Sequence, residues 1–242
     1  MKRLVVLGGG ESGIGTALLG KAKGYEVFVS DKGIIVEKYK EVLVNNEIDW
    51  EDEKHTEALI LNADLVMKSP GIPEKVEMVQ KLFQKGIPVI SEIEFASAFT
   101  QANIIGITGS NGKTTTATWT DYVLKNGGLN VALAGNIGDS FAKAVWKDKV
   151  EHYVLELSSF QLDGIEKFRP HIAVLTNITP DHLDRYEYKY ENYIASKFSI
   201  TKNQTEEDYF IYDADNPTIA EWIEKIEIKA KKLPLTFQKK VK

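Results

Sequence analysis

The 242-residue sequence contains no cysteine, which excludes disulfide bonds and thiolate metal sites. It also lacks any apolar run near the roughly 18 residues that a membrane-spanning helix needs. Residues 1–7 resemble the basic start of a signal peptide, but the glycines at residues 8–10 end the apolar run too early for one. We therefore expect no membrane insertion and, because a cysteine-free chain fits a reducing compartment, a cytoplasmic protein.

A surplus of positive charge is absent as well. The chain has 30 Lys and Arg against 35 Asp and Glu, a formal net charge of −5. Non-specific contact with nucleic acid relies on a basic face that neutralises phosphates, so we expect no nucleic-acid partner. The hydrophobic share of 43% and the charged share of 27% are typical of a globular protein with one large or two ordinary domains.

Apolar runs alternate with helix-compatible segments through the first 90 residues. The alternation predicts a parallel sheet of Rossmann-like type, which we place at residues 1–92. The expected strands are residues 4–7, 25–29, 65–67 and 88–90, and the expected helices are residues 14–23 and 74–84.

A second series of alternating elements begins near residue 103, after a connector without glycine or proline. It predicts a second α/β domain over residues 93–242, with a solvated basic helix and tail at residues 229–242. The expected strands are residues 104–108, 131–134, 153–157 and 172–176, and the expected helices are residues 114–126 and 140–146.

The most informative motif is Gly-Ile-Thr-Gly-Ser-Asn-Gly-Lys-Thr at residues 106–114. It follows an apolar strand and precedes a helix, the context in which backbone amides, a lysine and a hydroxyl bind a nucleoside triphosphate with Mg²⁺. The strict pattern requires glycine where Ile107 stands, so an ordinary glycine-rich turn remains the alternative. The residues that we expect at the ATP phosphates are Gly109, Ser110, Asn111, Gly112, Lys113, Thr114 and Thr115.

A second glycine pattern stands at the start of the chain. Gly8, Gly10 and Gly13 follow a strand, and Asp31 ends the next strand at the spacing of an acid that binds a ribose hydroxyl. The same backbone serves any diphosphate, so we favour a nucleotide diphosphate over NAD(P) or a structural turn. The Ser-Pro-Gly turn at residues 69–71 would lie at the same sheet edge, as a ligand loop or as a rigid turn.

Acidic and histidine residues follow two later strands. Glu156 ends an apolar strand beside the phosphate loop, where a Mg²⁺ ligand belongs. His182 stands between Asp181 and Asp184, which favours a metal or substrate role, although both aspartates could equally cap a helix. Lys197 lies in a helical pattern that by itself predicts only a solvated lysine.

Together these motifs resemble the Mur ligases of peptidoglycan synthesis, in particular the members that add D-glutamate. The resemblance covers the chain to about residue 220. It rests on the phosphate loop and on three further runs: Gly-Asn-Ile-Gly at residues 135–138, Glu-Leu-Ser-Ser-Phe-Gln-Leu at residues 156–162, and Thr-Asn-Ile-Thr-Pro-Asp-His-Leu-Asp-Arg-Tyr at residues 176–186.

The resemblance implies an ATP-dependent ligase that adds D-glutamate to UDP-N-acetylmuramoyl-L-alanine through an acyl phosphate, with two Mg²⁺ ions and no NAD. It assigns catalysis to Lys113, His182 and Lys197, and Mg²⁺ to Thr114, Glu156, His182 and Lys197, the lysine as a carbamate. Uridine and diphosphate contacts are implied for Ser12, Gly13, Ile14, Asp31, Lys32, Ser69, Pro70 and Gly71, and muramoyl-alanine contacts for Asn136, Ser158, Ser159 and Gln161.

Members of this family carry a third, C-terminal domain that binds D-glutamate and a later motif that contacts adenine. Neither has a counterpart here, so we expect a truncated chain with a partial central domain and negligible turnover alone. The full-length protein is expected to be a monomer. The alternatives are another Mur-type ligase, a folylpolyglutamate-type ligase and an NAD-dependent oxidoreductase. The folylpolyglutamate type lacks this N-terminal domain, and an oxidoreductase leaves the phosphate loop without a role.

Overall fold

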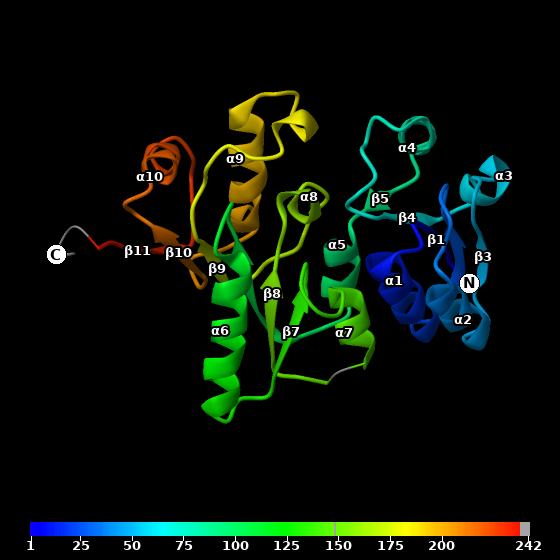
Figure 1. Cartoon of the computed structure of the whole chain (residues 1–242), viewed down its shortest axis with the longest axis horizontal. Coiled ribbons are helices and arrows are strands. Elements are labelled where there is room, and N and C mark those ends of the chain that lie inside the picture. The colour runs from blue at the N-terminus through cyan, green and yellow to red at the C-terminus, as the bar shows by residue number, and fades with distance from the viewer. Residues whose placement is uncertain (148, 238–242) are drawn as a thin grey trace. The chain divides into compact units, whose positions relative to one another are not determined.

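The computed structural model describes residues 1–147 and 149–237, which form two compact α/β units (Figure 1). Unit 1 comprises Met1–Thr100, Asp139–Lys149 and Gly164–Glu166, and unit 2 comprises Gln101–Gly138, Val150–Asp163 and Lys167–Lys242. Each unit is built on one parallel sheet, which confirms the predicted fold class. The domain boundary between residues 92 and 93 stays a prediction. No helix in the described ranges has the length and apolarity needed to cross a bilayer.

Unit 1 has a five-stranded sheet in the order β3-β2-β1-β4-β5, with every pair parallel. Residues 4–7 of the central strand β1 are apolar and buried, and Val5 packs with Phe28 and Val66 in the core. From β1 the chain adds β2 and β3 on one side and then β4 and β5 on the other, so the strand order reverses between β1 and β4. Doubly wound folds bind ligands at this point. The elements are β1 (Arg3–Leu7), α1 (Glu11–Ala22), β2 (Glu26–Ser30), α2 (Glu37–Asn45), β3 (Asp49–Glu51), α3 (Glu57–Ile60), β4 (Leu65–Lys68), α4 (Glu77–Gln84), β5 (Val89–Ile90), α5 (Glu92–Ser97) and α7 (Phe141–Lys147).

Unit 2 has a six-stranded parallel sheet in the order β11-β10-β9-β6-β8-β7. Ile107 and Val154 from its central strands pack with Ala117 of α6. Because all strands run the same way, their carboxyl ends share one edge. The elements are β6 (Asn103–Thr108), α6 (Lys113–Asn126), β7 (Val131–Gly135), β8 (His152–Glu156), α8 (Ser159–Leu162), β9 (Ile172–Leu175), η1 (Leu183–Arg185), α9 (Tyr190–Phe198), η2 (Ser199–Thr201), β10 (Tyr209–Asp213), α10 (Pro217–Ile223) and β11 (Lys231–Leu235).

The prediction of a solvated helix near the C-terminus is wrong. Residues 231–235 form strand β11, which pairs with β10 in parallel register from Tyr209↔Lys231 to Asp213↔Leu235. The lysines and the exposed Leu233 and Leu235 reflect an edge strand with a solvent-facing side. Residues 238–242, the rest of the expected tail, lie outside the described residues.

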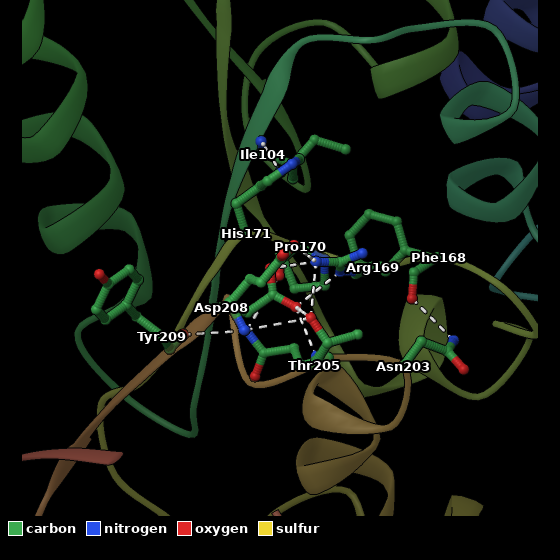
Figure 2. Close-up of polar contacts among 11 residues, drawn as sticks. Ile104, Phe168, Arg169, Pro170, His171, Asn203, Thr205, Asp208 and Tyr209 are labelled. Carbon is green, nitrogen blue, oxygen red and sulfur yellow. Dashed lines mark hydrogen bonds and ion pairs between the residues drawn. The ribbon is translucent and has the colours of Figure 1, made fainter. Parts of the chain in front are cut away.

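The amino-terminal edge of the unit 2 sheet is held by a polar cluster (Figure 2). Arg169 donates from Nε to Asp208 Oδ2 at 2.7 Å and from an η nitrogen to Oδ1 at 3.0 Å. Asp208 also accepts from the Thr205 backbone N–H at 2.6 Å, and its side chain is 2% exposed. This cluster joins the start of β9 to the start of β10, at the edge of the sheet opposite the phosphate loop.

Candidate functional site

The phosphate-loop motif forms the connection from β6 to α6. Gly109 and Gly112 take positive φ angles of 146° and 80°, which favour glycine. A Cβ at Gly109 would lie 2.0 Å from Thr176 Oγ1, so the loop has no room for a side chain there. Lys113 Nζ donates to the carbonyls of Gly109 and Ser110, both at 2.9 Å. The lysine ammonium is therefore held over its own loop, ready to meet phosphate oxygens.

Two oxygen-bearing side chains meet beside the loop. Thr114 Oγ1, in the first turn of α6, donates to Glu156 Oε2 at 2.7 Å, and Asn136 Nδ2 donates to Oε1 at 2.8 Å. Glu156 ends β8 and is buried. A threonine hydroxyl and a carboxylate are hard oxygen ligands of the kind that Mg²⁺ prefers. Thr115 is exposed in the same first turn.

The loop after β9 is hydrogen-bonded to the phosphate loop. Asn177 Oδ1 accepts from the Asn111 N–H at 2.9 Å, and its Nδ2 donates to the Asn111 carbonyl at 3.0 Å. Ser110 Oγ lies 2.9 Å from Tyr193 OH and accepts from the Thr179 N–H at 3.0 Å. Sequence patterns assign no role to Asn177, Thr179 or Tyr193, although the first two stand in the motif at residues 176–186.

Lys197 lies on α9, and the pattern-based prediction of a solvated lysine is wrong, because its exposed fraction is only 2%. Its Nζ sits 4.8 Å from the ring centre of Tyr193, one helical turn earlier. Burial and, after it, the charge of Lys113 lower the pKa of Lys197 to about 7, against the raising effect of Asp181 and Asp163. The helical face shared by Tyr193, Ile194, Lys197 and Phe198 is the signal that could have revealed this burial.

His182 stands in an exposed loop with φ of 49°. Its Nε2 lies 3.5 Å from Asp181 Oδ2, and its ring centre lies 5.3 Å from that of Phe160. No contact among the described residues joins His182 to Glu156 or Lys197. Residues 1–147 and 149–237 also contain no group of three or more acidic or histidine side chains placed to hold a metal ion. The metal role of His182 stays a prediction.

The Glu-Leu-Ser-Ser-Phe-Gln run begins helix α8. Ser158 Oγ accepts from the Gln161 N–H at 3.3 Å, and Gln161 Oε1 accepts from the Ser158 N–H at 2.9 Å, which forms a capping box. The Ser159 carbonyl accepts from Ser196 Oγ at 3.0 Å. These contacts give Ser158, Ser159 and Gln161 a local structural role, and their substrate contacts stay a prediction.

In unit 1 the first glycine loop joins β1 to α1. A Cβ at Gly13 would lie 1.8 Å from the Gly8 carbonyl oxygen, so helix and loop are in contact there. Asp31 Oδ2 accepts from the Gly9 N–H at 2.6 Å, and Oδ1 accepts from the Gly33 N–H at 2.8 Å. The carboxylate therefore holds two loops together at the carboxyl edge of the sheet.

The other predicted contacts of unit 1 surround this loop. The Ser69 N–H donates to the Leu7 carbonyl at 3.0 Å, which places the Ser-Pro-Gly turn beside Gly8. Lys32 and Gly71 are exposed, whereas Ile14 is buried in α1. Ser12 accepts from Thr16 Oγ1 through its carbonyl at 2.8 Å. A ligand would meet Ile14 through its backbone rather than its side chain.

Two parallel-sheet α/β units, one of which carries a phosphate loop at its carboxyl edge, define a nucleotide-binding protein of P-loop type. Family models agree with this class: the Mur ligase middle domain matches residues 107–241, and the MurD N-terminal domain matches residues 3–78. The chain belongs to the Mur ligase family.

Curated relatives match over nearly the whole chain. The UDP-N-acetylmuramoylalanine–D-glutamate ligase of Christiangramia forsetii is 65% identical over 240 residues, which are 99% of this chain and 54% of the relative. The protein of the same name from Bacteroides thetaiotaomicron is 54% identical over 239 residues, again 99% of this chain and 54% of the relative. The chain thus spans about half the length of the curated relatives it matches.

Solved structures support the fold. The UDP-N-acetylmuramate:L-alanyl-gamma-D-glutamyl-meso-diaminopimelate ligase from Neisseria meningitides superposes with a TM-score of 0.68 at 21% identity, over 96% of this chain and 78% of that chain. The UDP-N-acetylmuramate-alanine ligase MurC from Thermotoga maritima gives a TM-score of 0.61 at 19% identity, over 99% of this chain and 53% of that chain. At such identities the likeness concerns the fold alone.

Proposed function

We propose that this chain is the nucleotide-binding part of an ATP-dependent ligase that adds D-glutamate to UDP-N-acetylmuramoyl-L-alanine. The observation that carries the proposal is the meeting of Lys113, Thr114 and Glu156 at one sheet edge, in a chain whose N-terminal residues match a MurD N-terminal domain. Relatives bearing that name at 65% and 54% identity support the same substrates.

The phosphate loop would bind ATP. The loop leads directly into the start of α6 at Lys113, where the helix dipole favours an anion. Lys113 would exchange its two carbonyl partners for phosphate oxygens and neutralise charge on the γ-phosphate as the substrate carboxylate attacks it. That attack would form an acyl phosphate and release ADP, and the amine of D-glutamate would then attack the acyl carbon and displace phosphate to give the amide.

Mg²⁺ fits the pair formed by Thr114 and Glu156, because both present oxygen atoms beside the loop. When bound there, the ion would neutralise phosphate charge during transfer. Asn136 Nδ2 fixes the other oxygen of Glu156 and so orients the carboxylate. The two-ion requirement and the absence of NAD remain part of this proposal.

Lys197 is proposed to hold a second ion as a carbamate, with His182 as a further ligand. A neutral amine is the form that adds CO₂, and burial together with the Lys113 charge brings the pKa of Lys197 near neutrality. Catalysis by Lys113, His182 and Lys197 belongs to the same proposal.

Unit 1 is proposed to bind the uridine diphosphate of the substrate. Its donors would be the first glycine loop with Ser12, Gly13 and Ile14, together with Lys32 and the turn at residues 69–71. The acceptor would be Asp31. In unit 2, Asn136, Ser158, Ser159 and Gln161 are proposed to contact muramoyl-alanine. We further propose a cytoplasmic protein that is monomeric at full length and binds neither nucleic acid nor membrane.

Calorimetric titration tests the proposal. The chain is titrated with UDP-N-acetylmuramoyl-L-alanine, with NADH and UDP in parallel, and then with ATP and Mg²⁺. Saturable binding of the muramoyl substrate without binding of NADH supports the proposal, and binding of NADH alone overturns it. We expect negligible D-glutamate-dependent phosphate release from this chain by itself; robust release would contradict that expectation.

A further inference from the structure

A buried polar cluster in unit 1 is centred on Ser30, the residue before Asp31, and sequence patterns assign it no role. Glu51, at the end of β3, is 7% exposed. Its Oε1 accepts from Ser30 Oγ at 2.8 Å and from the Thr56 N–H at 2.7 Å, and its Oε2 accepts from Thr56 Oγ1 at 2.6 Å. His55 Nδ1 lies 2.7 Å from the same Ser30 oxygen.

The hydrogen bonds of this cluster determine the tautomer of His55. Burial acts to raise the pKa of Glu51, but the bonds from Thr56 and Ser30 outweigh burial and lower it, so Glu51 is an ionised acceptor. Ser30 must then donate its one hydroxyl proton to Glu51. Its oxygen accepts from His55, which therefore carries its proton on Nδ1 and presents Nε2 as a bare acceptor.

The ring lies at the edge of the sheet that carries Asp31. The Asp31 N–H donates to the Glu51 carbonyl at 3.1 Å, and the Lys54 N–H donates to the Asp31 carbonyl at 3.4 Å, so the loop containing His55 is paired with the loop after β2. His55 is partly exposed, and Nε2 makes no hydrogen bond within the described residues. A ligand that reaches Asp31 would find this second acceptor beside it.

We propose that His55 Nε2 accepts a hydrogen bond from the nucleoside of the nucleotide sugar bound at Asp31, from either a ribose hydroxyl or the uracil imide N–H. The inference rests on the proposed function of unit 1. Asp31 and His55 together form a pair of acceptors of different charge, which suits a uracil nucleoside, because its ribose hydroxyls and its imide N–H are all donors.

Two substitutions separate a ligand contact from a structural role. His55→Asn places an amide N–H where Nδ1 stands, which keeps the bond to Ser30 and removes the Nε2 acceptor. His55→Gln places an amide oxygen near Nε2, which keeps the acceptor and removes the bond to Ser30. The matched control is His152→Asn at the start of β8 in unit 2. UDP is the probe, and affinity is measured by calorimetry.

One hydrogen bond changes affinity about three- to tenfold. We expect His55→Asn to lower the affinity for UDP by that factor and His55→Gln to lower it less. The affinity of His152→Asn should equal that of the unsubstituted chain. UDP analogues lacking the 2′-hydroxyl or methylated at N3 identify the donor, because the analogue without it is insensitive to His55→Asn.

Acidic pH supplies an independent readout. Burial lowers the pKa of His55, opposed by Glu51 and Asp31 and assisted by Lys32. A further charged group at this cluster is Lys54, whose Nζ lies 4.0 Å from Glu51 Oε2. Protonation of Nε2 abolishes the acceptor, so UDP affinity should fall as the pH drops below the ordinary histidine pKa of about 6.5. The fall should be larger in the unsubstituted chain than in His55→Asn, because titration of UDP itself is common to both.

The outcomes are distinct. Equal affinities for UDP in the unsubstituted chain and His55→Asn overturn the role of His55 and leave the proposed function standing. An equal loss in the Asn and Gln variants, with a lowered melting temperature in both, shows a structural role and overturns the contact. No binding of UDP to the unsubstituted chain overturns both the proposed function of unit 1 and this inference.

Discussion

Removal of the Asp208 carboxylate should destabilise unit 2 severely, whereas removal of a neighbouring carboxylate should not. Asp208 is 2% exposed and receives two hydrogen bonds from Arg169 and further bonds from Thr205 (Figure 2). Glu207 contacts the same guanidinium at 3.7 Å, but its side chain is 89% exposed. The two carboxylates share the partner Arg169 but differ in burial, so Glu207→Ala is the matched control for Asp208→Ala.

The magnitude follows from what each change leaves behind. Breaking a buried ion pair costs about 3–5 kcal/mol, but the Arg169 side chain is 36% exposed and can be rehydrated, so Asp208→Ala should cost about 2–3 kcal/mol. Glu207→Ala should cost less than about 0.5 kcal/mol. At about 2–4 °C per kcal/mol, Asp208→Ala corresponds to a melting-point decrease of roughly 4–12 °C.

Urea denaturation and thermal scans followed by circular dichroism measure both variants. Burial acts to raise the pKa of Asp208, but bonds from Arg169 and Thr205 outweigh it and hold the pKa below its usual value. The stabilisation is therefore present above the unfolded-state pKa near 3.9 and is lost as pH falls through the lower folded-state pKa. Equal losses for Asp208→Ala and Glu207→Ala near neutral pH would refute the reasoning.

Three further predictions concern other buried groups. Lys197, with a pKa of about 7, should give a carbamate signal by carbon-13 NMR in labelled bicarbonate, and a signal unchanged in Lys197→Met would contradict the assignment. Gly13→Ala, with its Cβ 1.8 Å from a backbone oxygen, should destabilise unit 1 by about 1–3 kcal/mol; Gly10→Ala, which meets nothing within 4 Å, is the control, and equal melting points count against the contact. Burial raises the pKa of Glu92 to about 7, so native stability should fall as pH rises from about 4.5 to 7, and an unchanged pH profile in Glu92→Gln would exclude this origin.

The parts of the fold that the sequence predicts are those with a local pattern. β6 and α6 were recognised from an apolar run, a glycine loop and helical spacing, and they begin within one residue of the expected positions. Glu156 was identified because a carboxylate that ends a buried strand stands out. The three-residue β3 has no such pattern, since two of the residues in Asp49–Glu51 are acidic and the segment becomes a strand through pairing with β2.

The remaining contacts depend on tertiary pairing. Tyr193 reaches Ser110 across 83 residues, and Arg169 reaches Asp208 across 39. No local rule pairs a tyrosine with one serine rather than another. Lys197 is an intermediate case: a lysine on a helix is usually solvated, and its apolar neighbours on α9 hint at the burial that the packing of this helix produces.

The electrostatics of the phosphate loop connect the two lysines. Lys113 is held by two loop carbonyls, which stabilise its positive charge. That charge and burial favour a neutral Lys197, because a second ammonium in this low-dielectric region would repel the first. A polyanion at the loop would shift the protonation equilibrium of Lys197 back toward the ammonium form, since its negative charge stabilises both ammonium groups. The neutral amine that the proposed carbamate requires is therefore favoured before a nucleotide binds, and that carbamate would add negative charge for Lys113 and a bound cation to neutralise.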